Sequence, residues 1–151
     1  MPSGIVLDNT VLSVFKRLDE IDLLKKILVS DVLIPAGVVD EYLQIGDYSD
    51  LEGFDIIEVN GEANYSMGKG ETQAILLAKD RNCVFATDDR RARVYANKND
   101  IKTTGTIGIL LAGVSKGAVS RQKAIDVLNR INSKKLLYMS DDIFKYAMNK
   151  I

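Results

Sequence analysis

The sequence predicts an α/β protein in which helices cover both faces of a parallel sheet. Short apolar runs of strand type alternate along the chain with segments whose apolar residues recur at helical spacing. Apolar strands separated by amphipathic helices are typical of parallel sheets that are buried on both sides. The 151 residues include only two prolines and no Gly/Ser-rich linker, so we predict one domain over residues 1–151.

The predicted strands are apolar runs that stop at a polar residue, a proline or a turn. Asp8 ends the first run, Pro35 stops the second, an Asn60-Gly61 turn follows the third and Thr87 closes the fourth. The strands are expected at residues 4–7, 32–34, 54–59, 83–86 and 101–104.

Helical segments fill the intervals between these strands and most of the C-terminal part of the chain. Ser120 and Ser140 are the expected N-caps of the last two helices, because a serine hydroxyl can accept a hydrogen bond from a first-turn N–H group. Residues 47–53 are expected to form a loop. Helices are expected at 11–15, 21–28, 38–45, 71–79, 90–98 and 105–117, and after the two serines.

The chain contains no histidine and a single cysteine, Cys83. The lack of imidazole excludes Ser-His-Asp and Cys-His catalysis and every histidine-ligated metal site. One thiol excludes a disulfide framework and a cysteine-rich zinc site. Any chemistry must therefore use carboxylates, hydroxyls and amines.

Two features of the sequence concern its cellular location. No run of about 18 apolar residues occurs, so we expect no membrane span. Asp8 interrupts the apolar core that a signal peptide would need at the N-terminus. We therefore expect a cytoplasmic protein with no membrane partner.

The net charge of −1 hides an uneven distribution of charge along the chain. Residues 1–62 hold 13 acidic and 4 basic side chains, whereas residues 63–151 hold 8 acidic and 16 basic ones. The positive second half favours a surface that faces a polyanion, or head-to-tail association between copies of the chain. Solvated helix faces are the simplest explanation of any single charge.

Carboxylates lie where the predicted strands end or where helices begin. Asp8 ends the first strand, Asp88 and Asp89 follow the fourth, Glu41 lies one turn into the helix after the second, and Glu71 begins a helix. Because ligands of parallel sheets bind beyond the carboxyl ends of the strands, we expect these groups at one edge. Glu71 could instead be a helix-start acid that only interacts with the helix dipole. A carboxylate that closes a buried strand, as Asp8 does, is costly without a cation or hydrogen-bond donors.

Several carboxylates at one sheet edge cannot all stay ionised without a counter-charge. Mg²⁺ or Mn²⁺, which prefer oxygen ligands, fit this requirement better than zinc. The chemistry that such a site favours is phosphodiester hydrolysis by metal-activated water, which needs no histidine.

Taken in order along the chain, these motifs resemble those of a PIN-domain ribonuclease. The resemblance spans residues 4–117 and rests on the order and spacing of the motifs. A further segment at 104–111 is similar to one prokaryotic PIN subgroup. The motifs are Asp8-Asn9-Thr10, Val39-Asp40-Glu41-Tyr42, Gly68-Lys69-Gly70-Glu71-Thr72-Gln73-Ala74 and Thr87-Asp88-Asp89-Arg90-Arg91-Ala92-Arg93.

The resemblance implies a three-layer α/β/α sandwich with a central parallel sheet. It also implies cleavage of single-stranded RNA with Mg²⁺ or Mn²⁺ and, in many members, a homodimer. Members that resemble VapC toxins are silenced by a cognate antitoxin protein, which makes an antitoxin an expected partner.

The resemblance also assigns roles to residues of the acidic motifs. Asn9 and Thr10 match a polar cluster that supports the first aspartate, and Thr10 is a candidate for a bond to a ligand. The family's spacing favours Asp89 over Asp88, and Glu71 stands where an aspartate is more common. The implied metal ligands are Asp8, Glu41, Glu71 and one or both of Asp88 and Asp89.

Basic side chains crowd the segment that follows the acidic pair. The candidates for contacts with RNA phosphates are Arg90, Arg91, Arg93, Lys98 and, more weakly, Lys69. The alternative is a solvated helix face on which Arg93 pairs with an acid. Tyr42 and Tyr95 could stack on an unpaired base, although a position in the core accounts for them more simply.

Two other functions compete with the nuclease. A phosphatase of the haloacid-dehalogenase type also begins with a strand-end aspartate, but it needs a second aspartate where Thr10 stands. A non-catalytic PIN-like module would bind RNA or protein without cutting. Such a module should lose nothing when Asp8 is changed to Asn.

Overall fold

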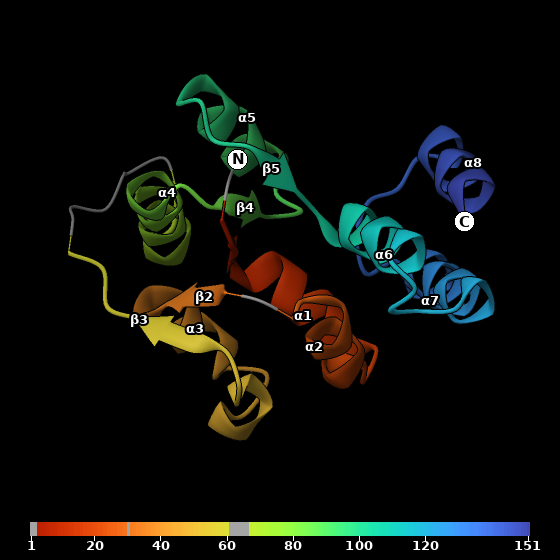
Figure 1. Ribbon diagram of the computed structural model, residues 1–151, viewed down its shortest axis with the longest axis horizontal. Coiled ribbons are helices and arrows are strands. Elements are labelled where there is room, and N and C mark those ends of the chain that lie inside the picture. Colours follow the sequence, from red (N-terminus) through yellow and green to blue (C-terminus); the bar gives the residue numbers. More distant parts are fainter. Residues whose placement is uncertain (1–2, 30, 61–66) are drawn as a thin grey trace.

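The computed structural model describes residues 3–29, 31–60 and 67–151, which form a parallel sheet flanked by helices (Figure 1). Its strand order is β3-β2-β1-β4-β5, and every pair of neighbouring strands is parallel. The predicted α/β class with a helix-covered parallel sheet is confirmed. The strands are β1 (Ile5–Leu7), β2 (Val32–Pro35), β3 (Asp55–Ile57), β4 (Val84–Ala86) and β5 (Thr103–Thr104).

Helices occupy most of the other described residues. Ser120 and Ser140 cap the last two helices as predicted, each accepting a hydrogen bond from a backbone N–H three residues later. The expected Asn60-Gly61 turn extends outside the described residues. The helices are α1 (Asn9–Arg17), α2 (Ile21–Ile27), α3 (Ala36–Tyr42), the 3-10 helix η1 (Tyr48–Leu51), α4 (Lys69–Arg81), α5 (Arg90–Lys98), α6 (Thr106–Ser115), α7 (Arg121–Lys134) and α8 (Asp141–Lys150).

The two edge strands are shorter than predicted. The strand expected at 101–104 pairs only over Thr103–Thr104, because Ile101 donates its backbone N–H to the carbonyl of Ala96 and so closes the end of α5. Its apolar side chain is buried under α5 and Phe85, which explains why the sequence pattern extended the strand. β3 likewise covers only Asp55–Ile57 of the predicted 54–59.

Residues 47–53 are not simply a loop, because they contain η1. Asp47 and Asp50 cap this short helix reciprocally. The Oδ2 atom of Asp50 also accepts hydrogen bonds of 2.9 Å from the hydroxyl of Tyr42 and from Nζ of Lys16. The hydrogen bond from the backbone N–H of Asp47, followed by the contact with Lys16, lowers the pKa of Asp50. The contacts with α1 and α3 order a segment whose polar composition predicted no helix.

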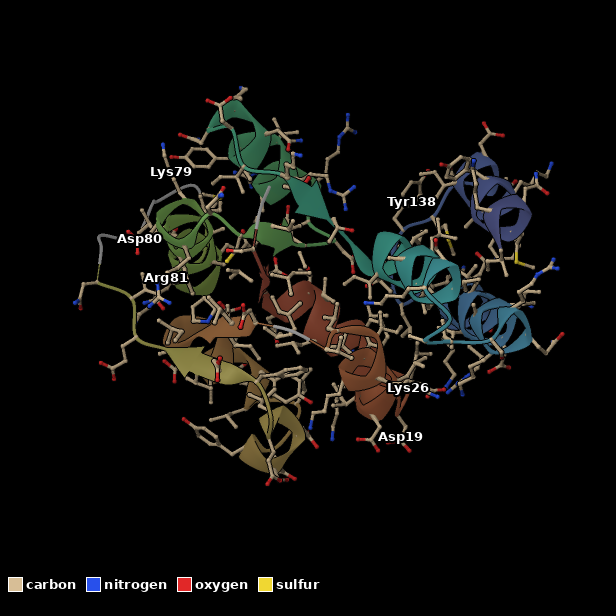
Figure 2. The ribbon with its side chains drawn as sticks, in the orientation of Figure 1. Asp19, Lys26, Lys79, Asp80, Arg81 and Tyr138 are labelled. Carbon is tan, nitrogen blue, oxygen red and sulfur yellow. The ribbon has the colours of Figure 1, made fainter. Side chains whose placement is uncertain are left out.

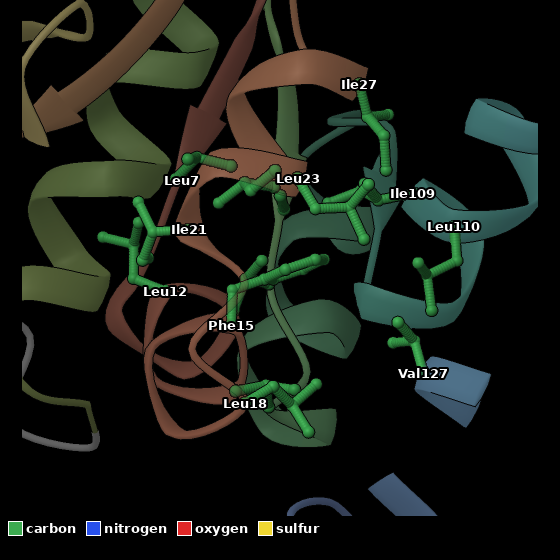
Figure 3. Packing of buried hydrophobic residues seen from close by; sticks show 14 of the residues in the cluster. Leu7, Leu12, Phe15, Leu18, Ile21, Leu23, Ile27, Ile109, Leu110 and Val127 are labelled. Atoms are coloured by element: carbon green, nitrogen blue, oxygen red, sulfur yellow. The ribbon is translucent and has the colours of Figure 1, made fainter. Parts of the chain in front are cut away.

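Two hydrophobic cores lie on opposite faces of the sheet. Successive strand residues point to opposite faces, so Val6 and Phe85 pack with α4 and α5, whereas Leu7 packs with α1, α2 and α6. Figure 3 shows the larger core, where Phe15 of α1 lies among leucines and isoleucines of α1, α2 and α6. The sheet is thus the middle of three layers.

The C-terminal helices α7 and α8 lie on the side of α6 that faces away from the sheet (Figure 1). Their apolar residues extend the larger core outward. Glu20, in the turn between α1 and α2, ties α7 to the domain through ion pairs with Lys123 and Arg130. Within the described residues, none of the helices combines the length and apolarity that a bilayer crossing requires.

The register of the sheet determines where the polar strand ends meet. Leu7 of β1 pairs with Ala86 of β4, so Asp8 and Thr87 leave the two central strands side by side. The strand order also changes direction at this point, since β2 lies on one side of β1 and β4 on the other. Ligands of open α/β sheets bind at such a switch point.

Candidate active site

Asp8 is the most deeply buried charged residue of this edge, with 1% of its surface exposed. It caps α1, and its Oδ1 atom accepts hydrogen bonds from the N–H groups of Thr10 (2.9 Å) and Val11 (3.4 Å). Its Oδ2 atom is also buried but has no hydrogen-bond partner among the described residues. Burial raises the pKa of Asp8 from 3.8 to about 6, despite the hydrogen bonds that favour the ionised form.

Thr10 connects the ends of the two central strands. Its hydroxyl donates to Asp8 Oδ1 over 2.5 Å and accepts from the backbone N–H of Asp88 over 2.8 Å. Two hydrogen bonds therefore hold the hydroxyl of Thr10 in place. They fix the carboxylate of Asp8 relative to the end of β4.

The carboxylates of Asp88 and Asp89 accept hydrogen bonds from different helices. Asp88 accepts from Thr106 at both carboxylate oxygens, from the backbone N–H at 2.8 Å and from the hydroxyl at 2.5 Å. It thereby caps the start of α6. Asp89 caps α5, with Oδ1 accepting from the backbone N–H groups of Arg91 (2.8 Å) and Ala92 (3.3 Å).

Glu71 lies in the first turn of α4 and is surrounded by other acids. Burial, the charges of Asp89, Asp8 and Glu41, and the hydrogen bond with Asp89 together raise its pKa from 4.5 to about 7. The side chain is therefore half protonated near neutral pH when no cation is bound.

Glu41 reaches the same region from α3. Its Oε1 atom accepts a hydrogen bond of 3.2 Å from the backbone N–H of Gly70, and burial raises its pKa. A side chain at position 70 would collide with this carboxylate, so glycine there lets α3 and α4 approach. The charges of Asp8, Glu41 and Asp89 all act on Glu71, which shows that the fold brings these four predicted residues together.

The four acids suit a hydrated divalent cation better than a closed metal cage. In the described part of the chain, no group of three or more acidic or cysteine side chains is placed so that it could hold a metal ion together. Mg²⁺ binds through only one or two carboxylates and keeps several waters. The unpartnered Oδ2 of Asp8 and the raised pKa values of Asp8 and Glu71 are what a site that lacks its counter-charge should show.

Asn9 and Asp89 line a pocket of about 370 Å³ with residues from the C-terminal part of the chain. The Oδ1 atom of Asn9 is buried and has no hydrogen-bond partner within the described residues. The pattern of the C-terminal residues predicts packing on the sheet, or a dimer or antitoxin face, but does not show that they lie beside the acids. The other lining residues are Thr10, Ser13, Val14, Asp88, Leu136, Leu137 and Tyr138.

The predicted basic residues separate into two groups. Arg90 and Arg91 are exposed and line a second pocket of about 320 Å³ with Met67, Val94, Tyr95 and Lys98. Lys69 is exposed at the start of α4. Arg93 turns inward instead, and its Nη2 atom donates to the carbonyl of Thr87 over 2.8 Å rather than to an acid.

The two tyrosines also differ. Tyr42 is fully buried, and its hydroxyl donates to Asp50 over 2.9 Å, so the idea that it stacks on a base is wrong. Burial, and then the same contact with Asp50, raise the pKa of Tyr42 above its usual value. Tyr95 is exposed beside Arg91 and Lys98 and stays available to a ligand.

Comparison with known families identifies the family to which this fold belongs. The model of the PIN domain family DUF3368 matches residues 4–151. The chain belongs to the PIN domain family. Members of this family are generally nucleases that use divalent metals. The match extends over α7 and α8, beyond the segment in which the motifs lie.

A solved structure supports the PIN fold. The chain is similar to a PilT N-terminus domain protein from the hyperthermophilic archaeon Sulfolobus solfataricus P2, with a TM-score of 0.61 and 13% sequence identity. The similarity covers 78% of this chain and 94% of the archaeal one. Comparison with curated proteins finds no match.

Proposed function

We propose that this PIN domain is an endoribonuclease that cleaves single-stranded RNA through Mg²⁺ or Mn²⁺ held by Asp8, Glu41, Glu71 and Asp89. The observation that carries the proposal is the buried Oδ2 of Asp8, which has no partner among the described residues and lies within the field of other carboxylates. Fixing an isolated charge there is costly unless a cation offsets it. A bound cation would supply an activated water and stabilise the leaving oxygen of the phosphodiester.

Each acidic residue of the site would have a different role in binding the cation. Asp8 is held by Thr10 and the start of α1, so it would contribute an oriented carboxylate rather than a mobile one. Glu71 would bind once its proton is displaced by the cation, and Asp89 would bind beside it. Glu41, held by Gly70, would complete the negative field from the α3 side. Asp88, occupied by Thr106, would serve to anchor α6.

The RNA would approach along the exposed face of α5. Arg90, Arg91 and Lys98 line a pocket there, and α5 begins next to Asp89. Lys and Arg contacts with phosphates are independent of sequence, which suits binding of a single strand. Lys69 would add a further contact from α4.

The test is cleavage of a mixed single-stranded RNA pool with Mg²⁺, Mn²⁺ or EDTA. Asp8→Asn keeps the shape of the side chain and removes its charge, and Asp40→Asn, on the exposed side of α3, is the matched control. We expect cutting by the wild type and the control that EDTA and Asp8→Asn both abolish. RNA binding without cleavage in any metal would leave a non-catalytic module. The phosphatase alternative is disfavoured because Thr10 stands at its second aspartate and is tied to Asp8 and Asp88.

The remaining predicted partners stay predictions. A role as the toxin of a toxin-antitoxin pair would require a protein that blocks the acids or the α5 pocket. A homodimer would be detected by sedimentation of the purified chain. A cytoplasmic location fits an RNA substrate and a buried, unpaired Cys83.

A further inference from the structure

One wall of the pocket beside the acids is formed by residues that have no role in the proposed cleavage reaction. Asn9, Thr10, Asp88 and Asp89 form its inner side, and the linker between α7 and α8 forms the other. The pocket holds about 370 Å³, within the range of sites for small ligands. A substrate bound at the acids would therefore extend directly onto the linker.

The linker presents one aromatic ring to solvent. Tyr138 is 89% exposed, more than any other large apolar or aromatic side chain in the described part of the chain. Figure 2 shows it at the linker that leads into α8. Its neighbours Leu136, Leu137 and Met139 are partly buried against the larger core. The linker thus exposes Tyr138 while the residues around it are anchored.

The end of α7 fixes the direction of the linker. Lys135 adopts a left-handed conformation with φ of 52°, and the N–H groups of Lys135 and Leu136 return to the carbonyls of Asn132 and Ile131. This arrangement is a Schellman-type helix end, which reverses the chain at a defined angle. The backbone conformation at the end of α7 therefore determines the position of Tyr138 beside the acids.

We propose that Tyr138 stacks on an unpaired nucleobase of the RNA next to the phosphate that is cut. An exposed ring beside a polar pocket is suited to stacking, because every base has a π-face and the contact does not depend on sequence. The exposed Lys134 and Lys135 at the start of the linker would hold the phosphates that lead away from this base. This inference rests on the proposed nuclease and names a substrate-positioning residue for it.

The first test compares steady-state cleavage of a short single-stranded RNA by three variants. Tyr138→Ala should raise KM about five- to hundredfold, the range expected for loss of one base-stacking contact, with a smaller change in kcat. Tyr138→Phe keeps the ring and should restore the wild-type KM. Tyr146→Ala is the control, because Tyr146 is 58% exposed on α8 but does not line the pocket. Wild-type KM in Tyr138→Ala, with RNA still cut, overturns the inference and leaves the nuclease standing.

A second test measures the contact without catalysis. The chain has no tryptophan, so Tyr138→Trp introduces a single tryptophan that can be excited selectively over the tyrosines, and Tyr146→Trp introduces a matched one outside the pocket. In EDTA, single-stranded RNA should quench the emission of Tyr138→Trp, and the same RNA backbone with its bases removed should not. Tyr146→Trp should change little with either probe.

The outcomes distinguish failure of the stacking contact from failure of the proposed nuclease. Binding of fluorescent RNA, followed by anisotropy, without quenching at position 138 contradicts the stacking contact alone. Equal quenching by RNA with and without bases also contradicts it. If RNA neither binds nor is cut, the stacking contact and the proposed nuclease fail together.

Discussion

The hydroxyl of Thr10 accepts a hydrogen bond of 2.8 Å from the backbone N–H of Asp88 while it donates to Asp8. One side chain thus joins the ends of β1 and β4, which are neighbours in the sheet but far apart in sequence. The bonds fix Asp8 against the strand that leads to Asp89. The position of Asp8 in the site therefore depends on Thr10, which need not contact the substrate.

Thr10→Val should lower both stability and cleavage. The variant keeps the side-chain shape but leaves the N–H of Asp88 and one oxygen of Asp8 without this partner, which costs about 1–3 kcal/mol of unfolding free energy. Urea unfolding measures the loss, and cleavage at saturating Mg²⁺ measures the displacement of Asp8. Thr103→Val, at an exposed hydrogen bond on β5, is the control and should change neither. A Thr10→Val protein as stable as the wild type contradicts the bridging role.

Substitutions of Asp88 and Asp89 should have different effects, the first mainly on stability and the second mainly on cleavage. Asp89→Asn keeps an N-cap of similar strength for α5 but removes the charge that faces Glu71, so cleavage should fall by at least tenfold with little change in Tm. Asp88→Ala removes the cap of α6 and should cost about 1–2 kcal/mol. Thermal melts and cleavage rates of both variants check this. The reverse pattern would assign the ligand role to Asp88.

The metal-free protein should become less stable, through Asp8, as pH rises from about 4 to 6. Burial raises the pKa of Asp8 from 3.8 to about 6 in the folded state, so the folded protein binds the proton more tightly than the unfolded chain does. Stability is then gained below pH 4 and lost as pH rises through the folded pKa, by an amount on the order of 3 kcal/mol. Urea unfolding of wild type and Asp8→Asn in EDTA across this range isolates the contribution, since other groups titrate in both.

In that comparison, Asp8→Asn should gain stability relative to the wild type as pH rises. Saturating Mg²⁺ should reduce the difference, because the cation offsets the buried charge of the wild type. A constant difference between the two proteins from pH 4 to 7 would refute the raised pKa of Asp8.

The exposed cations of α5 should control the salt dependence of RNA binding. Arg90→Ala and Lys98→Ala should each weaken binding, and each should reduce the slope of log Kd against log salt by about 0.7 for a single strand. Lys79→Ala, near the far end of α4 (Figure 2), is the control. Anisotropy titrations at several salt concentrations give the slopes. If all three variants have the wild-type slope, RNA does not follow α5.

The sequence predicted the sheet and its acidic edge because both depend on local patterns. Apolar runs mark the central strands, and the polar residue after each run marks its carboxyl end, so the position of Asp8 beside Thr87 follows from the topology. The distinct partners of Asp88 and Asp89 could not be predicted, since they depend on where Thr106 begins α6. The exposure of Tyr138 depends on the helix end at Lys135, and non-glycine residues in this conformation leave little signal in sequence.

The central claim is that Asp8 and its neighbours form a divalent-cation site, and a titration of Mn²⁺ into the metal-free protein by calorimetry tests it most directly. Wild type and Asp40→Asn should bind Mn²⁺ and release protons near pH 7, because Glu71, which is half protonated at that pH, must give up its proton. Asp8→Asn should bind at least tenfold more weakly. Equal Mn²⁺ affinity in all three proteins, or no binding to the wild type, would contradict the account.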